Sequence, residues 1–271
     1  MSAHVALIGF GEAGSTFARA GGWGERARAY DLLAPRRSAA AGMGVVAART
    51  PGAALVGVPL VLSLVSADQA QAATAAYAGH LAPGAIWCDM NSVAPQTKRA
   101  AAQAVEAAGG RYVDVAVLAP VDPARLAVPL LLAGAAAEEA RQRLAALGFT
   151  NVRGVGAEVG RASAIKMIRS VMVKGLEALC DEMMAAAEAA GVADEVLASL
   201  DASEKPRPWS DRVAYNRERM ATHGARRAAE MEESARSLIA LGVDPTMTLG
   251  TVKRQRRAAA AAIKLRNERA A

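Results

Sequence analysis

The sequence is poor in aromatic residues. Phe, Trp and Tyr together make up 4% of its 271 residues, whereas hydrophobic residues as a whole make up 53%. The core must therefore be built from Ala, Val, Leu, Ile and Met. That apolar content is typical of a folded globular protein and excludes a disordered chain. The abundant alanine also favours helices, because Ala has the highest helix propensity.

Cysteine and histidine are scarce as well. The two cysteines, Cys88 and Cys180, lack a CxxC spacing, which argues against a disulfide framework and against a cysteine-based metal site. Of the three histidines, neither His4 nor His80 has a partner at a metal-ligand spacing. We therefore expect no bound metal ion.

The sequence lacks long apolar runs and a cationic N-terminal segment. No apolar stretch reaches the roughly 20 residues that a membrane-spanning helix needs. The first ten residues, MSAHVALIGF, have no basic segment before their apolar run, unlike a secretory signal peptide. We expect a protein without a membrane anchor, located in the cytoplasm.

The positive charge is concentrated at one end of the chain. The net charge is +6, and from Lys253 onward there are seven basic residues and one acid, so this tail accounts for the whole excess. A basic tail can contact nucleic acid or an acidic surface. This one lacks aromatic residues for base stacking and any recognisable nucleic-acid motif. We expect a solvated or subunit-packing terminal helix and no nucleic-acid partner.

Residues 1–157 alternate short apolar runs with helix-like segments. The expected strands are HVALIGF, RARAYD, VPLVLSLV, AIWCDMN, RYVDVAV and PLLLAG. Strands that alternate with helices predict an α/β domain of the Rossmann type with a mainly parallel sheet. VLSLV is almost entirely apolar, as expected for a strand that is buried on both faces.

Residues 158–271 show no strand signals and predict an all-helical second domain. Residues 159–190 read as one long helix that ends before Gly191. The segment SEKPRPWSDR contains two prolines and predicts a loop, and further helices follow it. The His-Gly pair at His223 is consistent with a turn before one of these helices. The expected domain boundary is at 157/158.

The segment LIGFGEAGSTF contains a glycine-rich turn. Gly9, Gly11 and Gly14 form the pattern GxGxxG directly after an expected strand and at the start of an expected helix. The first glycine permits the tight turn, the second admits the pyrophosphate close to the backbone, and the third allows helix and strand to pack closely. The helix N-terminus then attracts the phosphates. The turn GFGEAG, which includes Phe10, Glu12 and Ala13, therefore predicts dinucleotide binding.

An acidic residue follows at the expected spacing. Asp31 ends the second strand 22 residues after Gly9, where a carboxylate accepts hydrogen bonds from the ribose hydroxyls of NAD. This favours NAD over NADP, although Arg36 and Arg37 follow closely and can offset the preference. Val65 and Ser66, at the end of a third strand, are further candidates for cofactor contact.

Four segments in order resemble the β-hydroxyacid dehydrogenase family, which includes the 6-phosphogluconate dehydrogenases. They are the GFGEAG turn, DMNSVAP (89–95), YVDVAV (112–117) and Gly160 with Lys166. The resemblance implies hydride transfer between an alcohol and a nicotinamide cofactor, with Lys166 as the general acid/base. It also implies that Asn91 and Ser92 lie near nicotinamide and substrate, and that two copies associate through their helical domains.

The sequence departs from that family at the expected substrate site. Ser170 stands where the family usually has Asn, and Leu118, Ala119 and Pro120 replace its Ser-Gly-Gly. The replacement removes flexible backbone and one N–H donor, which favours a bulkier or less anionic substrate. Candidate substrate contacts are Asn91, Ser92, Leu118, Ser170 and His223. Arg169, Arg226 and Arg227 are alternative anion contacts.

Three functions stay open at this point. The first is an NAD(P)-dependent dehydrogenase or reductase in which Lys166 carries the proton. The second is an imine reductase-like enzyme, which the altered substrate turn permits. The third is a non-catalytic dinucleotide-binding regulator with a basic tail, in which Lys166 is an ordinary lysine at the edge of an amphipathic helix.

Overall fold

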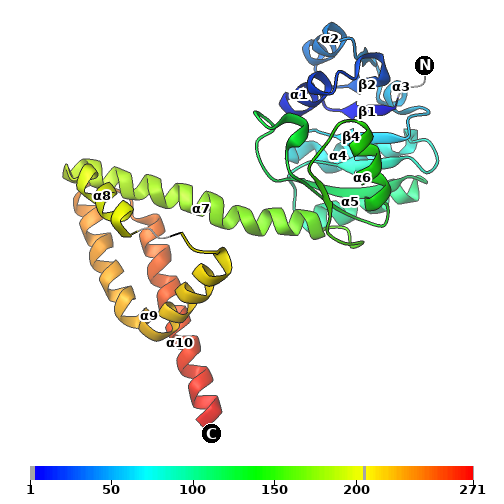
Figure 1. The fold of residues 1–271 in the computed structure, drawn as a ribbon. Helices are drawn as coiled ribbons and strands as arrows, with labels where there is room; N and C mark the ends of the chain where they lie inside the picture. The colour runs from blue at the N-terminus through cyan, green and yellow to red at the C-terminus, as the bar shows by residue number, and fades with distance from the viewer. Residues whose placement is uncertain (1–3, 204–205, 271) are drawn as a thin grey trace. The chain divides into compact units, whose positions relative to one another are not determined.

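The computed structural model describes residues 4–203 and 206–270, and the chain divides into two compact units, Met1–Arg169 and Ser170–Ala271 (Figure 1). The strands of the first unit are β1 (Val5–Ile8), β2 (Ala27–Tyr30), β3 (Val46–Ala47), β4 (Leu60–Ser63), β5 (Ile86–Asp89), β6 (Arg111–Val117), β7 (Leu130–Ala133) and β8 (Val152–Gly154). Its helices are α1 (Glu12–Ala20), α2 (Ala34–Gly42), α3 (Pro51–Leu55), α4 (Ala70–Tyr77), α5 (Pro95–Ala107) and α6 (Ala137–Ala146).

The eight strands form one sheet in the order β3-β2-β1-β4-β5-β6-β7-β8. β6 pairs with β7 in antiparallel fashion, and the other neighbouring strands are parallel. The strand order runs outward from β1 to β3 on one side and outward from β4 on the other, which places the carboxyl ends of β1 and β4 at a topological switch point. The expected α/β fold with a mainly parallel sheet is confirmed.

Alternation of side chains along the strands builds a separate core on each face of the sheet. Val5 and Leu7 of β1 pack into a core that also contains Phe17 of α1 and Leu144 of α6. Ala6 and Ile8 point to the opposite face, where α3 and α5 contribute their apolar residues. Helices on both faces explain why the central strands are buried throughout.

The structure contains four short elements that the periodicity did not indicate. They are α2, β3, α3 and β8. The two strands have two and three residues, too short for an alternation pattern. α2 has the sequence APRRSAAAG, which offers mainly alanine as an apolar signal. These elements are set by packing against the sheet and not by a strong local pattern.

The long helix α7 (Arg161–Ala190) contributes to both units. Its first turn belongs to the sheet domain, because Ala162 is buried with Ala116, Leu131 and Ala133 of β6 and β7. The units therefore divide within α7, after Arg169, whereas the sequence analysis placed the boundary at 157/158, just before the helix begins.

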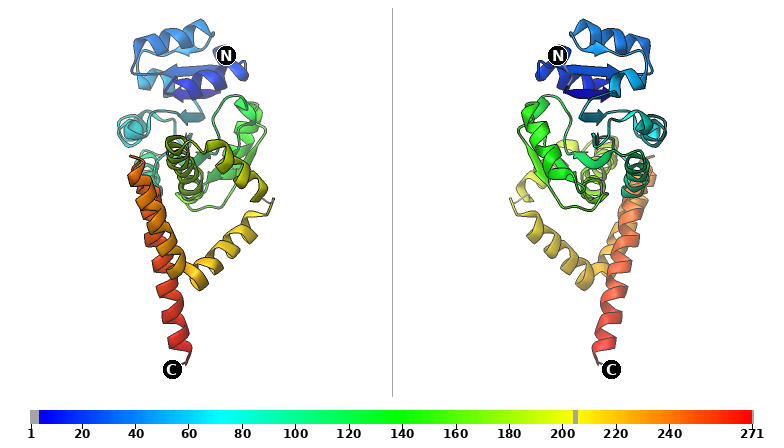
Figure 2. Two further views of the ribbon diagram at one scale, coloured as in Figure 1. Left: turned by 90° about the vertical axis from the view of Figure 1, so that its left-hand side faces the viewer. Right: turned by 90° about the vertical axis from the view of Figure 1, so that its right-hand side faces the viewer.

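The second unit consists of the remainder of α7, α8 (Ala193–Ser203), α9 (Trp209–Ala240) and α10 (Thr246–Ala270). α9 and α10 run side by side, as Figure 2 shows. Gly224 lies at their contact, where an added Cβ would be 2.5 Å from the carbonyl oxygen of Gln255. The expected turn at His223 is therefore wrong: His223 and Gly224 lie inside α9, and the glycine serves close helix packing.

Parts of the expected loop and tail are outside the described residues. These are Glu204 and Lys205 of the loop, together with the side chains of Arg266 and Arg269 in the tail. Within the described ranges, no helix is both long and apolar enough to cross a membrane.

Candidate functional site

The glycine-rich turn joins the carboxyl end of β1 to α1 and requires its glycines for steric reasons. Gly9 has φ +97°, and an added Cβ would lie 2.6 Å from the carbonyl oxygen of Leu64. A Cβ on Gly14 would lie 2.6 Å from the carbonyl oxygen of Gly9. The turn thus brings β1, β4 and the start of α1 together more closely than side chains would permit. The N-terminal N–H groups of α1 lie at the carboxyl end of the parallel strands, where they favour a bound phosphate.

Asp31 connects this turn to the end of β2 by hydrogen bonds. Its Oδ2 accepts a hydrogen bond from the backbone N–H of Phe10 at 2.8 Å, and its Oδ1 accepts from the backbone N–H of Leu33 at 2.9 Å. Each carboxylate oxygen retains a second acceptor position. The predicted ribose-binding carboxylate therefore also has a structural task that the sequence did not indicate.

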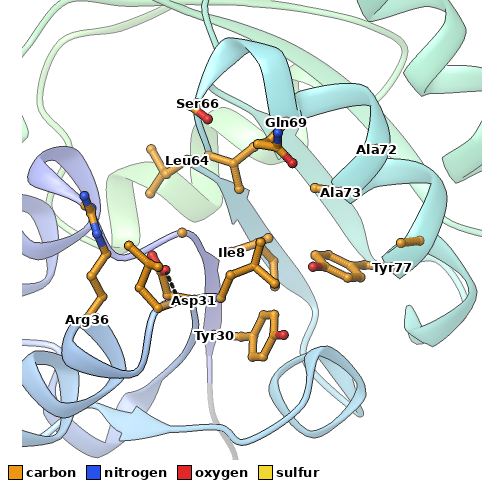
Figure 3. Close-up of a pocket in the computed structure, with 16 residues that line it drawn as sticks. Ile8, Tyr30, Asp31, Arg36, Leu64, Ser66, Gln69, Ala72, Ala73 and Tyr77 are labelled. Atoms are coloured by element: carbon orange, nitrogen blue, oxygen red, sulfur yellow. Dashed lines mark hydrogen bonds between the residues drawn. The ribbon is translucent and has the colours of Figure 1, made fainter.

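A cavity of about 420 Å³ opens between the glycine turn, the end of β2 and α4 (Figure 3). Gly9, Gly11 and Asp31 line one side, and Val65 and Ser66 line another. The size falls within the range of small-molecule and cofactor sites, roughly 300–1,000 Å³. These residues fit a bound dinucleotide, because the glycine cradle, the helix N-terminus and the carboxylate adjoin one cavity.

Two tyrosines close the far end of this cavity. Tyr30 and Tyr77 meet edge to face with ring centroids 5.8 Å apart, and Figure 3 shows both facing the cavity. Burial, with a contribution from Tyr30, raises the pKa of Tyr77, so the Tyr77 phenol stays neutral at physiological pH. This end of the cavity is therefore lined by aromatic rings.

The side chain of Arg36 flanks the opposite end. The guanidinium of Arg36 lies over Gly11, so that a Cβ on Gly11 would collide with it, and Arg36 lines the cavity. Arg37 instead donates to the carbonyl oxygens of Asp31 and Leu32, at 2.7 and 2.9 Å. Arg37 therefore holds the β2–α2 connection, while Arg36 faces the cofactor cavity.

The sequence predicted only part of the lining of this cavity. Phe10, Glu12, Ala13 and Gly14 belong to the turn but lie outside the cavity lining, and Asn91 lies outside it at the end of β5. The lining also contains residues that were missed: Ile8, Tyr30, Leu32, Leu33, Leu64, Gln69, Ala72, Ala73, Ala76 and Tyr77. Part of the lining has a helical spacing that the sequence shows, because Ala72, Ala73 and Ala76 of α4 follow Gln69, the residue before the helix, at a helical period.

A second group of residues lies where β5 ends and α7 begins. Lys166 Nζ donates a hydrogen bond to Ser92 Oγ at 2.5 Å, although 74 residues separate the two in sequence. Asn91 Nδ2 donates to Asp89 Oδ1 at 2.7 Å and to Ser63 Oγ at 3.0 Å. The Oδ1 atom of this buried asparagine has no hydrogen-bond partner among the residues described. The structure therefore brings together three of the predicted residues, Asn91, Ser92 and Lys166.

The other predicted substrate residues are distributed differently. Arg169 donates to the carbonyl oxygen of Leu118 at 3.2 Å. This hydrogen bond connects α7 to the 118–120 segment, where the family has Ser-Gly-Gly. Ser170 follows Lys166 by four residues, so the two share a face of the continuous helix α7. His223 is exposed within α9 of the second unit.

Neither the buried Cys88 nor a cluster of acidic, histidine or cysteine side chains among the described residues offers a further reactive centre. Burial, and the neighbouring Asp89, raise the pKa of Cys88 to about 12, so this thiol stays protonated and is unsuited to nucleophilic catalysis. Across residues 4–203 and 206–270, no group of three His, Cys, Asp or Glu side chains is placed to hold a metal ion.

Comparison with protein families gives two matches. Residues 4–155 match the family described as the NAD binding domain of 6-phosphogluconate dehydrogenase, and residues 187–258 match DUF1932, a domain of unknown function. A 28.5 kDa protein encoded in the 7S RNA 5′ region of Methanothermus fervidus is 29% identical over 119 residues. That match spans 44% of this chain and 45% of the relative's length.

Solved structures extend the similarity over nearly the whole chain. A conserved hypothetical protein from Sinorhizobium meliloti 1021 is 39% identical, with TM-score 0.63 and coverage of 96% of this chain and 90% of that one. The conserved protein MTH1747, described as similar to 3-hydroxyacid dehydrogenases, is 27% identical, with TM-score 0.61 and coverage of 96% and 98%.

An imine reductase from Streptomyces aurantiacus shares the fold at 21% identity, with TM-score 0.76 and coverage of 96% of this chain and 98% of that one. The family match extends over more than half of the chain and includes the glycine turn and Asp31. The protein is therefore a member of the NAD(P)-binding oxidoreductase family of the β-hydroxyacid and 6-phosphogluconate dehydrogenases.

Proposed function

We propose that the protein is an NAD(P)-dependent oxidoreductase that interconverts an alcohol and a carbonyl, with Lys166 as the general acid/base. The observation that carries the proposal is the hydrogen bond from Lys166 Nζ to Ser92 Oγ. It joins the family's helix lysine to the segment after β5, at the carboxyl edge of the parallel strands where α/β enzymes bind their ligands.

When bound, the nicotinamide cofactor accepts or supplies the hydride. The task of this chain's own residues is to bind the substrate and to move a proton at its oxygen. In the direction of oxidation the neutral Lys166 amine takes the hydroxyl proton, and in the direction of reduction the ammonium returns it. Ser92 accepts a hydrogen bond from Lys166 and directs the amine, and its own hydroxyl proton can point to the substrate oxygen.

The substrate that we propose is larger or less anionic than a small hydroxyacid. Leu118, Ala119 and Pro120 stand where the family has Ser-Gly-Gly. Pro120 has no N–H to offer a carboxylate, and Arg169 engages the carbonyl oxygen of Leu118. This turn presents an apolar surface and a fixed backbone beside α7.

Imine reduction is the second candidate. The same apolar turn would accept a cyclic imine as readily as a bulky ketone, and the fold is shared with the Streptomyces aurantiacus imine reductase. In that reaction Lys166 would donate the proton to the substrate nitrogen. Retention of Lys166 and Ser92 as a hydrogen-bonded pair favours the alcohol–carbonyl reaction, in which one group both donates and accepts the proton.

For the cofactor we propose NADPH, in place of the NAD that Asp31 alone would favour. Arg36 lies over Gly11 and lines the cavity, so its guanidinium can pair with a 2′-phosphate. Asp31 already accepts hydrogen bonds from two backbone N–H groups, so fewer of its acceptor positions are left for the ribose hydroxyls.

We further propose that the helical unit associates with a second copy of this chain. The α7 side chains of Val171, Met172, Leu176 and Leu179 are between 42% and 74% exposed. Exposed apolar surface of this extent marks an interaction site. Association through the helical domains is the arrangement that the family resemblance implies.

The experiment that tests the function is a turnover screen read by NADPH and NADH absorbance. The panel contains hydroxyacids, diols, aryl alcohols, the matching carbonyls and cyclic imines. Turnover of alcohols or carbonyls supports the proposal, and turnover of imines alone supports the second candidate. Tight nucleotide binding without turnover on any member of the panel would contradict both and favour a dinucleotide-binding regulator.

A further inference from the structure

A buried cluster of charges lies behind the Ser92–Lys166 pair. Asp89 of β5 and Asp114 of β6 are neighbours in the parallel register of the two strands, and neither is exposed. Two carboxylates side by side in the interior repel each other strongly unless a cation lies between them. Lys98 of α5 supplies that cation, and its exposed fraction is 0%.

The ammonium of Lys98 bridges the two strands. Its Nζ donates to the backbone carbonyl oxygen of Asp89 at 2.6 Å, and it lies 3.0 Å from Asp89 Oδ1. The distance from Nζ to Asp114 Oδ1 is 3.6 Å. The ammonium of Lys98 is held in one position between Asp89 and Asp114, because moving away from either aspartate would leave a buried carboxylate without a counter-charge.

Asp89 builds the segment that carries Ser92. Its Oδ1 accepts from the backbone N–H of Asn91 at 2.9 Å and from the Asn91 side chain at 2.7 Å. Its Oδ2 accepts from the Tyr112 hydroxyl at 2.5 Å. The orientation of this segment therefore depends on the Asp89 carboxylate together with the contacts of Met90 and Asn91 to Ser63.

Asp114 fixes the start of the helix that carries Lys166. Its Oδ2 accepts from the backbone N–H groups of Gly160 and Ser163, at 3.2 and 2.9 Å. A carboxylate at a helix N-terminus satisfies otherwise unpaired N–H groups and interacts favourably with the helix dipole. Two aspartates and one lysine leave the cluster with a net negative charge, and the positive end of the helix dipole stabilises it.

We propose that Lys98 is a positioning residue that sets the approach of Lys166 to Ser92, by holding Asp89 and Asp114 at a fixed separation. On one side the hydrogen bonds of the cluster end at Asn91, the residue before Ser92, and on the other side they end at the first turn of α7. The inference rests on the proposed function of Lys166, and it adds Lys98, which does not line the cofactor cavity.

The test compares three full-length variants by hydrogen exchange and mass spectrometry. Lys98→Met removes the ammonium but keeps the length of the side chain. Asp114→Asn keeps an oxygen that caps α7 but removes the charge that faces Lys98. Val105→Ala is the matched control, because Val105 is also fully buried on α5 but packs in the apolar core.

Lys98→Met is expected to speed exchange of the Asn91 amide and of the 160–166 amides by about tenfold relative to Val105→Ala, the effect of losing one hydrogen bond. Asp114→Asn is expected to speed exchange at 160–166 and to leave Asn91 unchanged. Acetylation of Lys166 by acetic anhydride should be faster in Lys98→Met, because its contact with Ser92 is loosened.

The proposal is overturned if Lys98→Met matches Val105→Ala at both segments, or if Lys166 acetylation is unchanged. It is also overturned if Asp114→Asn leaves 160–166 unchanged. NADPH binding, followed by fluorescence, should stay within about twofold in Lys98→Met, since a general loss of structure would weaken it. These readouts need no turnover, so their failure is distinct from failure of the proposed function, which a Lys166 variant tests.

Discussion

At the scale of single residues, Arg36 and Asp31 carry opposite electrostatic preferences within one cavity. Asp31 is anchored by the backbone N–H groups of Phe10 and Leu33. Arg36 reaches over Gly11 at the edge of the same cavity. The sequence indicated both residues, but their contributions depend on hydrogen bonds that only the folded loop defines.

We expect Arg36→Ala to weaken NADPH binding by about 10- to 100-fold, the loss of one or two charge-assisted hydrogen bonds to phosphate. NADH binding should change by less than about twofold, because NADH has no 2′-phosphate. Fluorescence titration of both nucleotides measures this, with the exposed Arg19→Ala on α1 as control. Equal weakening of both nucleotides would remove Arg36 from 2′-phosphate recognition.

Gly9 gives a steric prediction at the same scale. Gly9→Ala places a Cβ 2.6 Å from the carbonyl oxygen of Leu64 at a positive φ, so both stability and nucleotide binding should fall. Gly22→Ala is the control, because Gly22 also has a positive φ but has open space around its added Cβ. It should show the backbone strain alone, about 1–2 kcal/mol. Thermal unfolding with and without NADPH measures both effects, and equal losses in the two variants would refute the clash.

At the scale of elements, the sequence predicted the strands and helices that have a long periodic or continuously apolar pattern. The central strands are apolar because both faces are covered, and α7 is long and ends before Gly191. By contrast, β3 and α3 are too short to show a period. β3 is defined by its contacts with β2 and α2, and α3 by its contacts with β1 and β2 together with its Thr50 cap. Likewise, nothing local distinguishes Lys98 from the solvated lysines of other helices. Its burial follows from the pairing of β5 with β6.

In the helical unit, Glu182 of α7 makes contacts that the sequence pattern does not predict. Burial opposes ionisation of Glu182, but hydrogen bonds from the Thr248 hydroxyl and from the backbone N–H groups of Met247 and Thr248 outweigh it, so the pKa is lowered. Glu182 thereby caps the N-terminus of α10, 66 residues away in sequence. No sequence motif pairs residues across such a distance.

We expect Glu182→Gln to lower the free energy of unfolding by about 1–3 kcal/mol near neutral pH. Because the folded-state pKa lies below the unfolded value of 4.5, this stabilisation is present above pH 4.5 and is lost as the pH falls through the folded-state pKa. Urea unfolding at several pH values measures the difference, with the exposed Glu177→Gln on α7 as control. A difference that persists unchanged at pH 3 would contradict the ionised cap.

At the scale of the whole molecule, α7 exposes an apolar surface. Val171 is 74% exposed and Leu176 is 51% exposed. We propose a second copy of the chain as the partner of this surface, so the wild type should sediment as a dimer. Val171→Glu with Leu176→Glu should give monomers, because charges are excluded from the centre of such interfaces. Analytical ultracentrifugation distinguishes these states, and a wild-type monomer at micromolar concentration would contradict the assembly.

The central claim is that Lys166 moves the substrate proton, and one comparison tests it most directly. Lys166→Met and the control Lys174→Met, eight residues further along α7, are assayed on the substrate that the screen identifies, at saturating NADPH. We expect Lys166→Met to lower kcat by at least about 10²-fold, the scale of lost acid–base catalysis, with NADPH affinity unchanged and Lys174→Met fully active. Turnover by Lys166→Met at the wild-type rate would contradict the account.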